Sequence, residues 1–173
     1  MVAGTMTITH RELTFKAMEK IKLSPGPVLD VGCRDNSLKK IFEDRGFKWT
    51  GCDLVVNKDV DQCKMEELPY KSKRFELVFV CHSFEHTERP AEALREFQRV
   101  LSETGKLVIS TPLHCKHQIL DADEDHINVI TKMQMERLLK YVGLKKEKIW
   151  VERNNPDTDK DNSMITVCMR NDK

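Results

Sequence analysis

An almost unbroken apolar run at residues 75–81, Phe-Glu-Leu-Val-Phe-Val-Cys, is the feature of this sequence that most constrains its fold. A strand with one solvent-facing side alternates apolar and polar residues, whereas a continuous run suits a strand covered on both faces, as in a parallel sheet. Further strand-like runs occur at residues 27–31, 48–55 and 106–111. The chain therefore predicts a buried, mainly parallel sheet whose strands are joined by longer connections.

Segments with helical spacing lie between these runs. Apolar residues recur at the i, i+3, i+4 and i+7 positions of a helical face, most clearly in residues 131–142. Pro90 suits the first turn of a helix, where its missing amide proton is not needed. Thr9 and Thr131 each precede a Glu or Gln by three positions, which is the capping-box pattern. We therefore expect helices at residues 9–23, 37–45, 90–101 and 131–142.

The order of strands and helices predicts a doubly wound α/β fold around a mainly parallel, seven-stranded sheet. Residues 148–152 and 164–170 are strand-like runs with no helical pattern between them, so we expect an antiparallel C-terminal pair at the sheet edge. A short strand near residues 59–61 completes the seven. A chain of 173 residues suits one domain. We expect an N-terminal helix in residues 1–25, a cofactor-binding core in 26–145 and a hairpin in 146–173.

Composition is that of an ordinary globular protein. Charged residues make up 33% and the net charge is +1, which gives no general electrostatic reason to expect a nucleic-acid partner. The N-terminal segment lacks the apolar core of a signal peptide, and no apolar run approaches a membrane span of about 20 residues. The six cysteines never form a Cys-x-x-Cys pair, which indicates reduced thiols. We expect a cytoplasmic protein, monomeric or homodimeric, with no membrane partner.

The residues that follow the first two strands indicate the ligand, since doubly wound sheets bind ligands at the carboxyl ends of their strands. Gly32 is the one glycine of the first turn, where a dinucleotide-binding loop has the pattern Gly-x-Gly-x-x-Gly. Asp35 adds a negative charge where a phosphate would bind. Asp53 ends the second strand and is placed to accept hydrogen bonds from both hydroxyls of an adenosine ribose. With Asp30, these residues predict a nucleoside ligand whose tail carries no phosphate.

Five motifs in order resemble the class I S-adenosylmethionine-dependent methyltransferases, especially those that act on small molecules. They are VLDVGC at residues 28–33, GCDLV at 51–55, the stretch from MEELP at 65–69 to EHTERP at 85–90, the stretch that ends in STP at 110–112, and the His, helix and glycine segment at 123–144. The resemblance covers roughly residues 26–145. Arg34 and Asn36 depart from the family pattern, which usually has glycine at or near these positions.

The resemblance implies S-adenosyl-L-methionine as the cofactor and a small molecule as the methyl acceptor. The first turn would bind the amino-acid tail of the cofactor, with Asp30 and Asp35 serving its ammonium group and Arg34 or backbone amides its carboxylate. The implied cofactor-binding residues are Asp30, Gly32, Cys33, Arg34, Asp53, Leu54, Met65, Cys81 and His82. His82 and His86 follow the fourth strand, where the methyl group would be presented, and are the candidate catalytic residues. Further candidates are His114, His117 and His126.

Besides the role of a histidine as a base or substrate contact, Glu85 and His86 allow two interpretations. In the first the pair is structural, because it bonds loop backbone and caps the next helix. In the second, His82, Glu85 and His86 lie on one turn and hold a metal ion together with His126. This cluster resembles, with His82 in place of a glutamate, the magnesium site of small-RNA 2′-O-methyltransferases, although three imidazoles suit zinc, iron or manganese better. We favour the structural interpretation and assign no metal ligand.

Two other functions stay open on the sequence. The first is a methyltransferase for RNA or protein, since little beyond the core fold is left to form a lid and an open site admits a larger substrate. The second is a degenerate fold that binds cofactor or a partner without turnover, which Arg34 and Asn36 favour. Residues 112–130 contain three His and four acids and are expected to recognise the acceptor.

Overall fold

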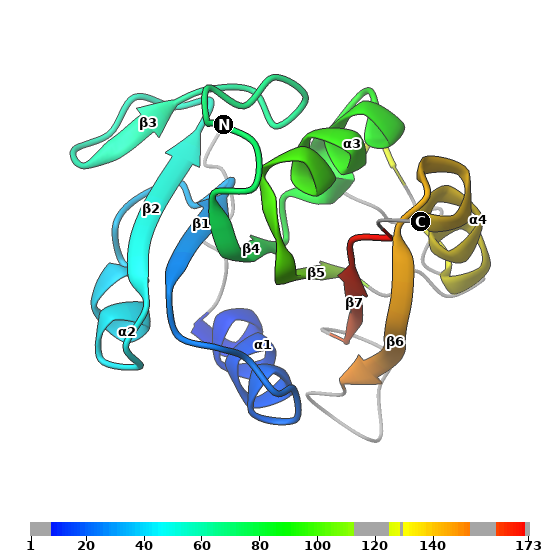
Figure 1. The fold of residues 1–173 in the computed structure, drawn as a ribbon, viewed down its shortest axis with the longest axis horizontal. Coiled ribbons are helices and arrows are strands. Elements are labelled where there is room, and N and C mark those ends of the chain that lie inside the picture. The colour runs from blue at the N-terminus through cyan, green and yellow to red at the C-terminus, as the bar shows by residue number, and fades with distance from the viewer. Residues whose placement is uncertain (1–7, 113–124, 129, 153–161, 172–173) are drawn as a thin grey trace.

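A single seven-stranded sheet with helices on both faces forms the architecture (Figure 1). The computed structural model describes residues 8–112, 125–128, 130–152 and 162–171, with side chains from residue 14 onward. The strands are β1 (Pro27–Val31), β2 (Lys48–Asp53), β3 (Val60–Gln62), β4 (Phe75–Cys81), β5 (Leu101–Pro112), β6 (Lys145–Glu152) and β7 (Ser163–Met169). The helices are α1 (Ile8–Glu19), α2 (Lys39–Glu43), the 3-10 turn η1 (Phe84–His86), α3 (Pro90–Val100) and α4 (Lys132–Val142). The predicted doubly wound α/β fold is confirmed.

The strand order is β3-β2-β1-β4-β5-β7-β6, and among the described strands β7 alone runs in the opposite direction to the others. β6 and β7 form the predicted antiparallel pair, with β7 inserted between β5 and the edge strand β6. β1 pairs with β2 on one side and with β4 on the other. The direction of strand addition therefore reverses between β3 and β4. In such sheets this reversal makes the carboxyl ends of β1 and β4 the expected place for a ligand.

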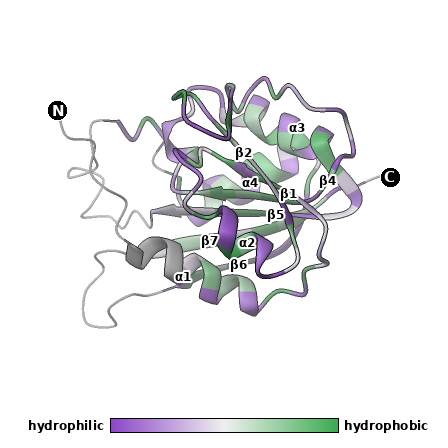
Figure 2. Ribbon diagram, turned by 90° about the vertical axis from the view of Figure 1, so that its left-hand side faces the viewer, coloured by the Kyte–Doolittle hydropathy of each residue, from purple (hydrophilic) through white to green (hydrophobic). Residues whose placement is uncertain are grey.

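Two apolar clusters hold the helices on the sheet, one on each face, and Figure 2 shows the apolar strands between the two helix layers. On one face, Phe15 of α1 and Phe42 of α2 pack against Phe79 of β4, with ring centroids 5.7 and 5.2 Å from that of Phe79. On the other face, Phe97 of α3 and Met135 of α4 are fully buried. Burying a side chain of this size contributes roughly 1.5–3 kcal/mol. β4 is thus covered on both faces, as its apolar run predicts.

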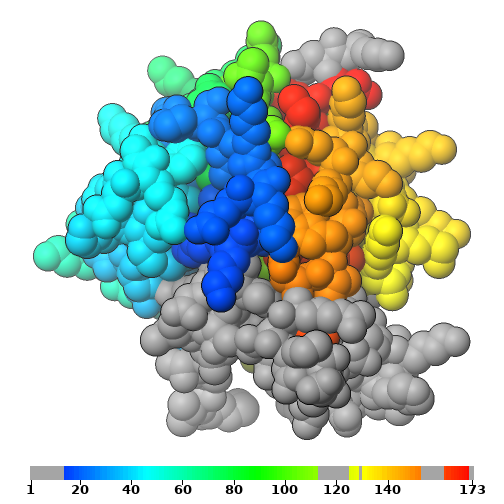
Figure 3. All heavy atoms as spheres, turned by 90° about the horizontal axis from the view of Figure 1, so that it is seen from below, coloured from blue at the N-terminus to red at the C-terminus, as the bar shows by residue number. Residues whose placement is uncertain are grey.

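The N-terminal helix is bonded to the C-terminal half of the sheet. Thr14 of α1 donates its hydroxyl to Ser110 Oγ of β5 at 3.1 Å. Lys20, just after α1, forms an ion pair with Glu152 at the end of β6, and Figure 3 shows α1 beside β6.

No helix in the described part of the chain is both long and apolar enough to span a membrane.

Several element ends differ from the expected ones. α1 ends at Glu19 rather than near residue 23, α2 has only five residues, and β5 begins at Leu101 instead of residue 106. The capping box at Thr131 is confirmed, since Thr131 Oγ1 accepts the Gln134 amide and Gln134 Oε1 accepts the Thr131 amide. The box expected at Thr9 rests on side chains outside the described residues.

Candidate functional site

The turn after β1 depends on Gly32, whose φ is 68°. A Cβ at this position would lie 2.3 Å from the Cβ of Ser83, a distance that real structures do not tolerate. Ser83 in turn donates its hydroxyl to the carbonyl oxygen of Val31 at 3.0 Å. Glycine therefore allows the turn after β4 to pack against the turn after β1. The two turns at the switch point of the sheet lie in direct contact.

Asp53 fixes the backbone of this turn from the end of β2. One of its carboxylate oxygens accepts the amide of Arg34 at 2.7 Å, and the other accepts the amide of Val55 at 2.9 Å. Arg34 has a φ of 64°, a left-handed conformation that is uncommon for residues other than glycine. The structure thus brings the predicted site residues Arg34 and Asp53 together, through the backbone of Arg34. Each carboxylate oxygen of Asp53 has a further lone pair with which to accept another hydrogen bond.

Two asparagines bond the turn after β1 to the loop after β2. Asn57 donates its side-chain amide to the carbonyl oxygen of Arg34 at 3.1 Å, and Asn36 donates to Asp59 Oδ2 at 3.3 Å. These bonds hold a turn that lacks the expected glycines at positions 34 and 36. The sequence gives no reason to single out Asn57, because it lies in a polar stretch without periodicity.

Asp30 lies in the interior, with 1% of its surface exposed, and accepts a hydrogen bond from Trp49 Nε1 at 3.1 Å. Gly51 makes room for the Trp49 ring, since a Cβ there would lie 2.3 Å from it. Cys33 is buried beside the same ring. Burial, together with the negative charges of Asp30 and Asp53, raises the pKa of the Cys33 thiol far above its usual value, so this thiol stays protonated. Asp30 and Cys33 therefore support the turn after β1 from the interior of the protein.

The loop after β3 returns to the same edge of the sheet. The amide of Cys63 donates to the carbonyl oxygen of Asp53 at 2.9 Å, and the Tyr70 hydroxyl donates to Asp61 Oδ2 at 2.9 Å. Burial is the main cause that raises the pKa of Tyr70 above its usual value, so the hydroxyl keeps its proton. Met65 is half-buried against the core, and Leu54 is 63% exposed. Tyr70 cannot be predicted as a site residue, because no local pattern in the sequence connects it to Asp61.

His82 follows β4 and has a φ of 50°. Its Nε2 lies 2.9 Å from Ser163 Oγ at the start of β7, and its amide donates to the carbonyl oxygen of Ser110. Cys81, the last residue of β4, is buried with its Sγ 3.4 Å from Thr14 Oγ1. The insertion of β7 beside β5 brings Ser163 to His82. This partner cannot be predicted from the spacing of residues in the sequence.

Glu85 and His86 contact the segment at residues 125–128. The Asn128 amide donates to the carbonyl oxygen of Glu85 at 2.9 Å, and His86 Nδ1 lies 2.8 Å from the carbonyl oxygen of Asp125. The expectation that this pair caps the next helix is wrong, because α3 begins after Arg89 without a side-chain cap and Thr87 Oγ1 accepts the Arg89 amide. Burial raises the pKa of Glu85 to about 8.

His126 joins this group. Its ring lies edge to face with that of His86, at a centroid distance of 5.0 Å. His114, His117 and most of the expected acceptor-recognition segment lie outside the described residues. The structure thus brings His86 and His126 together, and it places Glu85 beside both.

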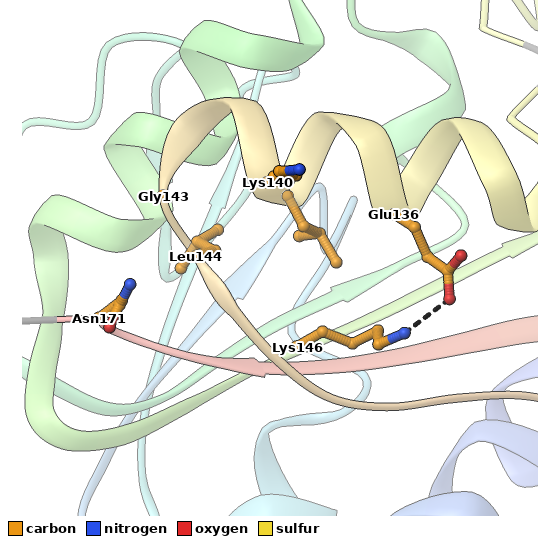
Figure 4. Close-up of a pocket in the computed structure, with 7 residues that line it drawn as sticks. Glu136, Lys140, Gly143, Leu144, Lys146 and Asn171 are labelled. Carbon is orange, nitrogen blue, oxygen red and sulfur yellow. Dashed lines mark hydrogen bonds and ion pairs between the residues drawn. The ribbon is translucent and has the colours of Figure 1, made fainter.

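A shallow surface pocket lies between the end of α4 and the start of β6 (Figure 4). It contains an ion pair between Lys146 and Glu136, 2.7 Å apart. Because β6 runs parallel to β5, its first residues lie at the edge of the sheet opposite the carboxyl ends of the parallel strands. The pocket is therefore remote from the turns after β1 and β4, and we assign it no role in the site.

The chain matches a family model and part of a curated protein. A family model described as "Methyltransferase domain" matches residues 9–149. The sterol 4-C-methyltransferase strm-1 of Caenorhabditis elegans is 25% identical over 109 residues, which cover 53% of this chain and 33% of the worm protein. The chain thus spans about a third of the length of the curated relative it matches.

Solved structures share the fold at low sequence identity. The 1,6-didemethyltoxoflavin-N1-methyltransferase of Burkholderia thailandensis, solved with 1,6-didemethyltoxoflavin and S-adenosylhomocysteine, is 16% identical with a TM-score of 0.76, over 95% of this chain and 79% of that chain. The [4+2]-cyclase SpnF is 17% identical with a TM-score of 0.72, over 92% and 80% of the two chains. At such identities the likeness concerns the fold, which hosts more than one reaction.

Proposed function

The chain belongs to the methyltransferase-domain family, and we propose that it transfers the methyl group of S-adenosyl-L-methionine to a small-molecule acceptor. The observation that carries this proposal is the pair of turns in contact at the switch point, together with Asp53 at the end of β2, which accepts the amide of Arg34 in the first turn. These turns offer backbone amides and acidic side chains in place of a glycine-rich phosphate cradle. Such a site suits a nucleoside with an amino-acid tail.

The described residues divide into those that would contact the cofactor and those that hold the turn. Asp53 would accept the ribose hydroxyls with its remaining lone pairs, and the exposed Arg34 would bind the carboxylate of the tail. Leu54 and Met65, from the loops after β2 and β3, would cover the adenine. The buried residues Asp30, Cys33 and Cys81 lie behind these groups, so we propose that they position the turn.

A bound sulfonium supplies an activated methyl group with a good leaving group, so the protein needs to align the acceptor and exclude water. We propose that His82 accepts the proton of a hydroxyl or ammonium acceptor. Its Nε2 is bonded to Ser163, and its Nδ1 lies 3.8 Å from Glu85 Oε1, so both neighbours orient the ring. His86 is exposed and its Nδ1 is bonded to a backbone carbonyl, which makes it the weaker of the two predicted bases.

We propose a small molecule as the acceptor because the net charge of +1 provides no general attraction for nucleic acid. The names of a sterol methyltransferase and a toxoflavin-precursor methyltransferase among the similar proteins support the same class. We further propose that the protein acts in the cytoplasm as a monomer or homodimer.

The identity of the cofactor can be tested by titration calorimetry of the full chain with S-adenosylmethionine, S-adenosylhomocysteine and NADH. We expect micromolar binding of the first two ligands and none of the third. Asp53→Ala should lose most of this affinity while remaining folded by circular dichroism. Asp44→Ala is the matched control, because Asp44 is exposed at the C-terminal end of α2 and pairs with Lys40 of the same helix. Absence of binding by both adenosyl ligands would overturn the proposal.

The glycine-poor turn favours a second candidate, a protein that binds the cofactor without methyl transfer. Arg34 and Asn36 are the residues that suggest it, and SpnF, a similar structure, is named a cyclase rather than a methyltransferase. Incubation with cofactor carrying a labelled methyl group and a panel of hydroxyl, amine and carbon acceptors separates the two. Labelled product supports the methyltransferase, whereas tight cofactor binding without any transfer supports the second candidate.

A further inference from the structure

We propose that Glu85, His86 and His126 bind one divalent transition-metal ion, and that zinc is the ion that best fits this donor set. One ligand atom from each side chain lies within 4.8 Å of the other two. Ligand atoms on a common tetrahedral zinc lie about 3.3 Å apart, given zinc–ligand distances of about 2.0–2.1 Å. Small side-chain rotations therefore close the group around an ion.

The buried carboxylate of Glu85 supplies an independent reason for a cation. Glu85 is only 1% exposed, and its Oε2 has no hydrogen-bond partner in the described part of the chain. A buried polar atom without a partner is unfavourable, and a buried charge is normally paired or bound to a metal. An ion between Glu85 and the two histidines would provide that partner.

The hydrogen bond of His86 leaves the correct nitrogen available. Its Nδ1 lies 2.8 Å from the carbonyl oxygen of Asp125, and a carbonyl only accepts, so Nδ1 carries the proton. The lone pair of Nε2 is therefore free to bind a metal. Metal-binding histidines usually donate their other ring N–H to a carbonyl or carboxylate in this way, which fixes tautomer and ring orientation.

The backbone around the cluster is held in place on both sides. Asn128 donates its amide to the carbonyl oxygen of Glu85 and its side chain to that of Thr87. Thr87 donates its hydroxyl to Glu66. These bonds fix the segment that carries His126 against the turn that carries Glu85 and His86, although the two are about 40 residues apart in the chain.

The donor types select the class of ion. Two imidazoles and one carboxylate suit zinc and related transition metals, whereas magnesium prefers oxygen ligands alone. His82 is not part of this set, because among the described residues only Glu85, His86 and His126 bring ligand atoms within 4.8 Å of one another, and His82 Nε2 is bonded to Ser163. Three protein ligands leave a fourth position of a tetrahedral zinc for water or another ligand. The site is thus open and lies next to the turn after β4.

Metal binding by the full, tag-free chain tests the proposal without any use of methyl transfer. We expect one equivalent of zinc by elemental analysis after reconstitution, and strong visible bands of four-coordinate cobalt on titration with Co²⁺. Glu85→Gln and His126→Ala should each weaken zinc binding at least about 100-fold in competition with a chelator, since even outer-shell changes cost 10–100-fold. Glu88→Gln is the matched control, because it makes the same change on an exposed side chain three residues away.

Circular dichroism checks that each variant is folded. If Glu85→Gln does not fold, the zinc affinity of His126→Ala decides the test. Three results would overturn the proposal: no stoichiometric zinc or cobalt binding, unchanged affinity in folded Glu85→Gln and His126→Ala, or displacement of zinc by equimolar magnesium. If the chain binds no metal at these residues, the outcome of the cofactor titration is unaffected, so the two proposals are tested separately.

Discussion

Arg34 shows how this chain accommodates an ordinary residue where a glycine is expected. Its φ of 64° lies in the left-handed region, which costs residues with a Cβ about 1–2 kcal/mol. Asp53 accepts its amide at 2.7 Å, and Asn57 donates to its carbonyl oxygen at 3.1 Å. Both backbone polar groups of Arg34 are therefore satisfied in this conformation, so the surrounding bonds hold it there.

We predict that Arg34→Gly is more stable than Arg34→Ala by about 1 kcal/mol in urea denaturation, because glycine enters the left-handed region without steric cost. Both variants keep the backbone amide that Asp53 binds. Titration with S-adenosylhomocysteine then separates the roles of backbone and side chain: parental affinity in Arg34→Gly assigns tail recognition to the backbone, and weakened binding in both variants assigns it to the guanidinium. If the alanine variant were at least as stable as the glycine variant, the left-handed backbone conformation at position 34 would not be strained.

The predictable part of the site is the part that is local in sequence. Gly32 directly follows a recognisable strand and Asp53 ends the next one, so both can be identified from the sequence. Asn57, Tyr70 and Ser163 cannot be identified in this way, because their partners come from other segments. Ser163, for example, reaches His82 only because β7 inserts beside β5, 81 positions later in the chain.

At the scale of elements, helix α3 holds residues 68–70, which lie between the loop after β3 and the start of β4. Arg99 donates to the carbonyl oxygens of Tyr70 and Leu68 at 2.7 and 2.8 Å, and Glu96 accepts the amide of Leu68 at 2.8 Å. Arg99 also forms an ion pair with Glu96 at 2.7 Å. Tyr70 in turn bonds Asp61 of β3, so this helix stabilises the loop that borders the proposed adenine site.

We predict that Glu96→Gln lowers stability at neutral pH by about 1–2 kcal/mol and makes stability less sensitive to acid. The hydrogen bond from Arg99 is the main cause that lowers the pKa of Glu96 in the folded protein. Its contribution is therefore complete above the unfolded value of about 4.3 and is lost as the pH falls through the folded value. Urea denaturation at pH 7 and pH 3 measures the difference. An equal loss of stability in parent and variant between these pH values would refute the assignment.

Element type followed from the sequence, whereas several element ends did not. α2 was expected from residue 37, but Asp35 Oδ1 accepts the amide of Ser37 at 2.9 Å and Asn36 bonds Asp59, which delays the helix to Lys39. β5 starts early because a register shift between Phe75 and Leu77 lets Leu101 pair with Phe75. Both differences arise from contacts between separate segments, which override local propensity.

At the scale of the whole molecule, the sheet couples its two helix layers. Phe79 of β4 contacts Phe15 and Phe42 on one face, while neighbouring residues of β4 contact the α3 and α4 layer on the other. α1 is also bonded to β5 through Thr14 and paired with β6 through Lys20. No described layer has a core of its own apart from the sheet, which favours unfolding in one step.

The two tryptophans allow this expectation to be tested, since Trp49 lies on β2 and Trp150 on β6, toward opposite edges of the sheet. We predict that Trp49→Phe and Trp150→Phe proteins each give urea midpoints by fluorescence that coincide with those by far-ultraviolet circular dichroism. Introducing Phe15→Ala should lower stability by about 3–5 kcal/mol, since Phe15 is buried on α1, and should shift all these transitions together. Phe15→Leu, which retains most of the apolar volume, should shift them less. If Phe15→Ala moved only the Trp150 transition, α1 and the C-terminal strands would form a separate folding unit and the chain would not be one domain.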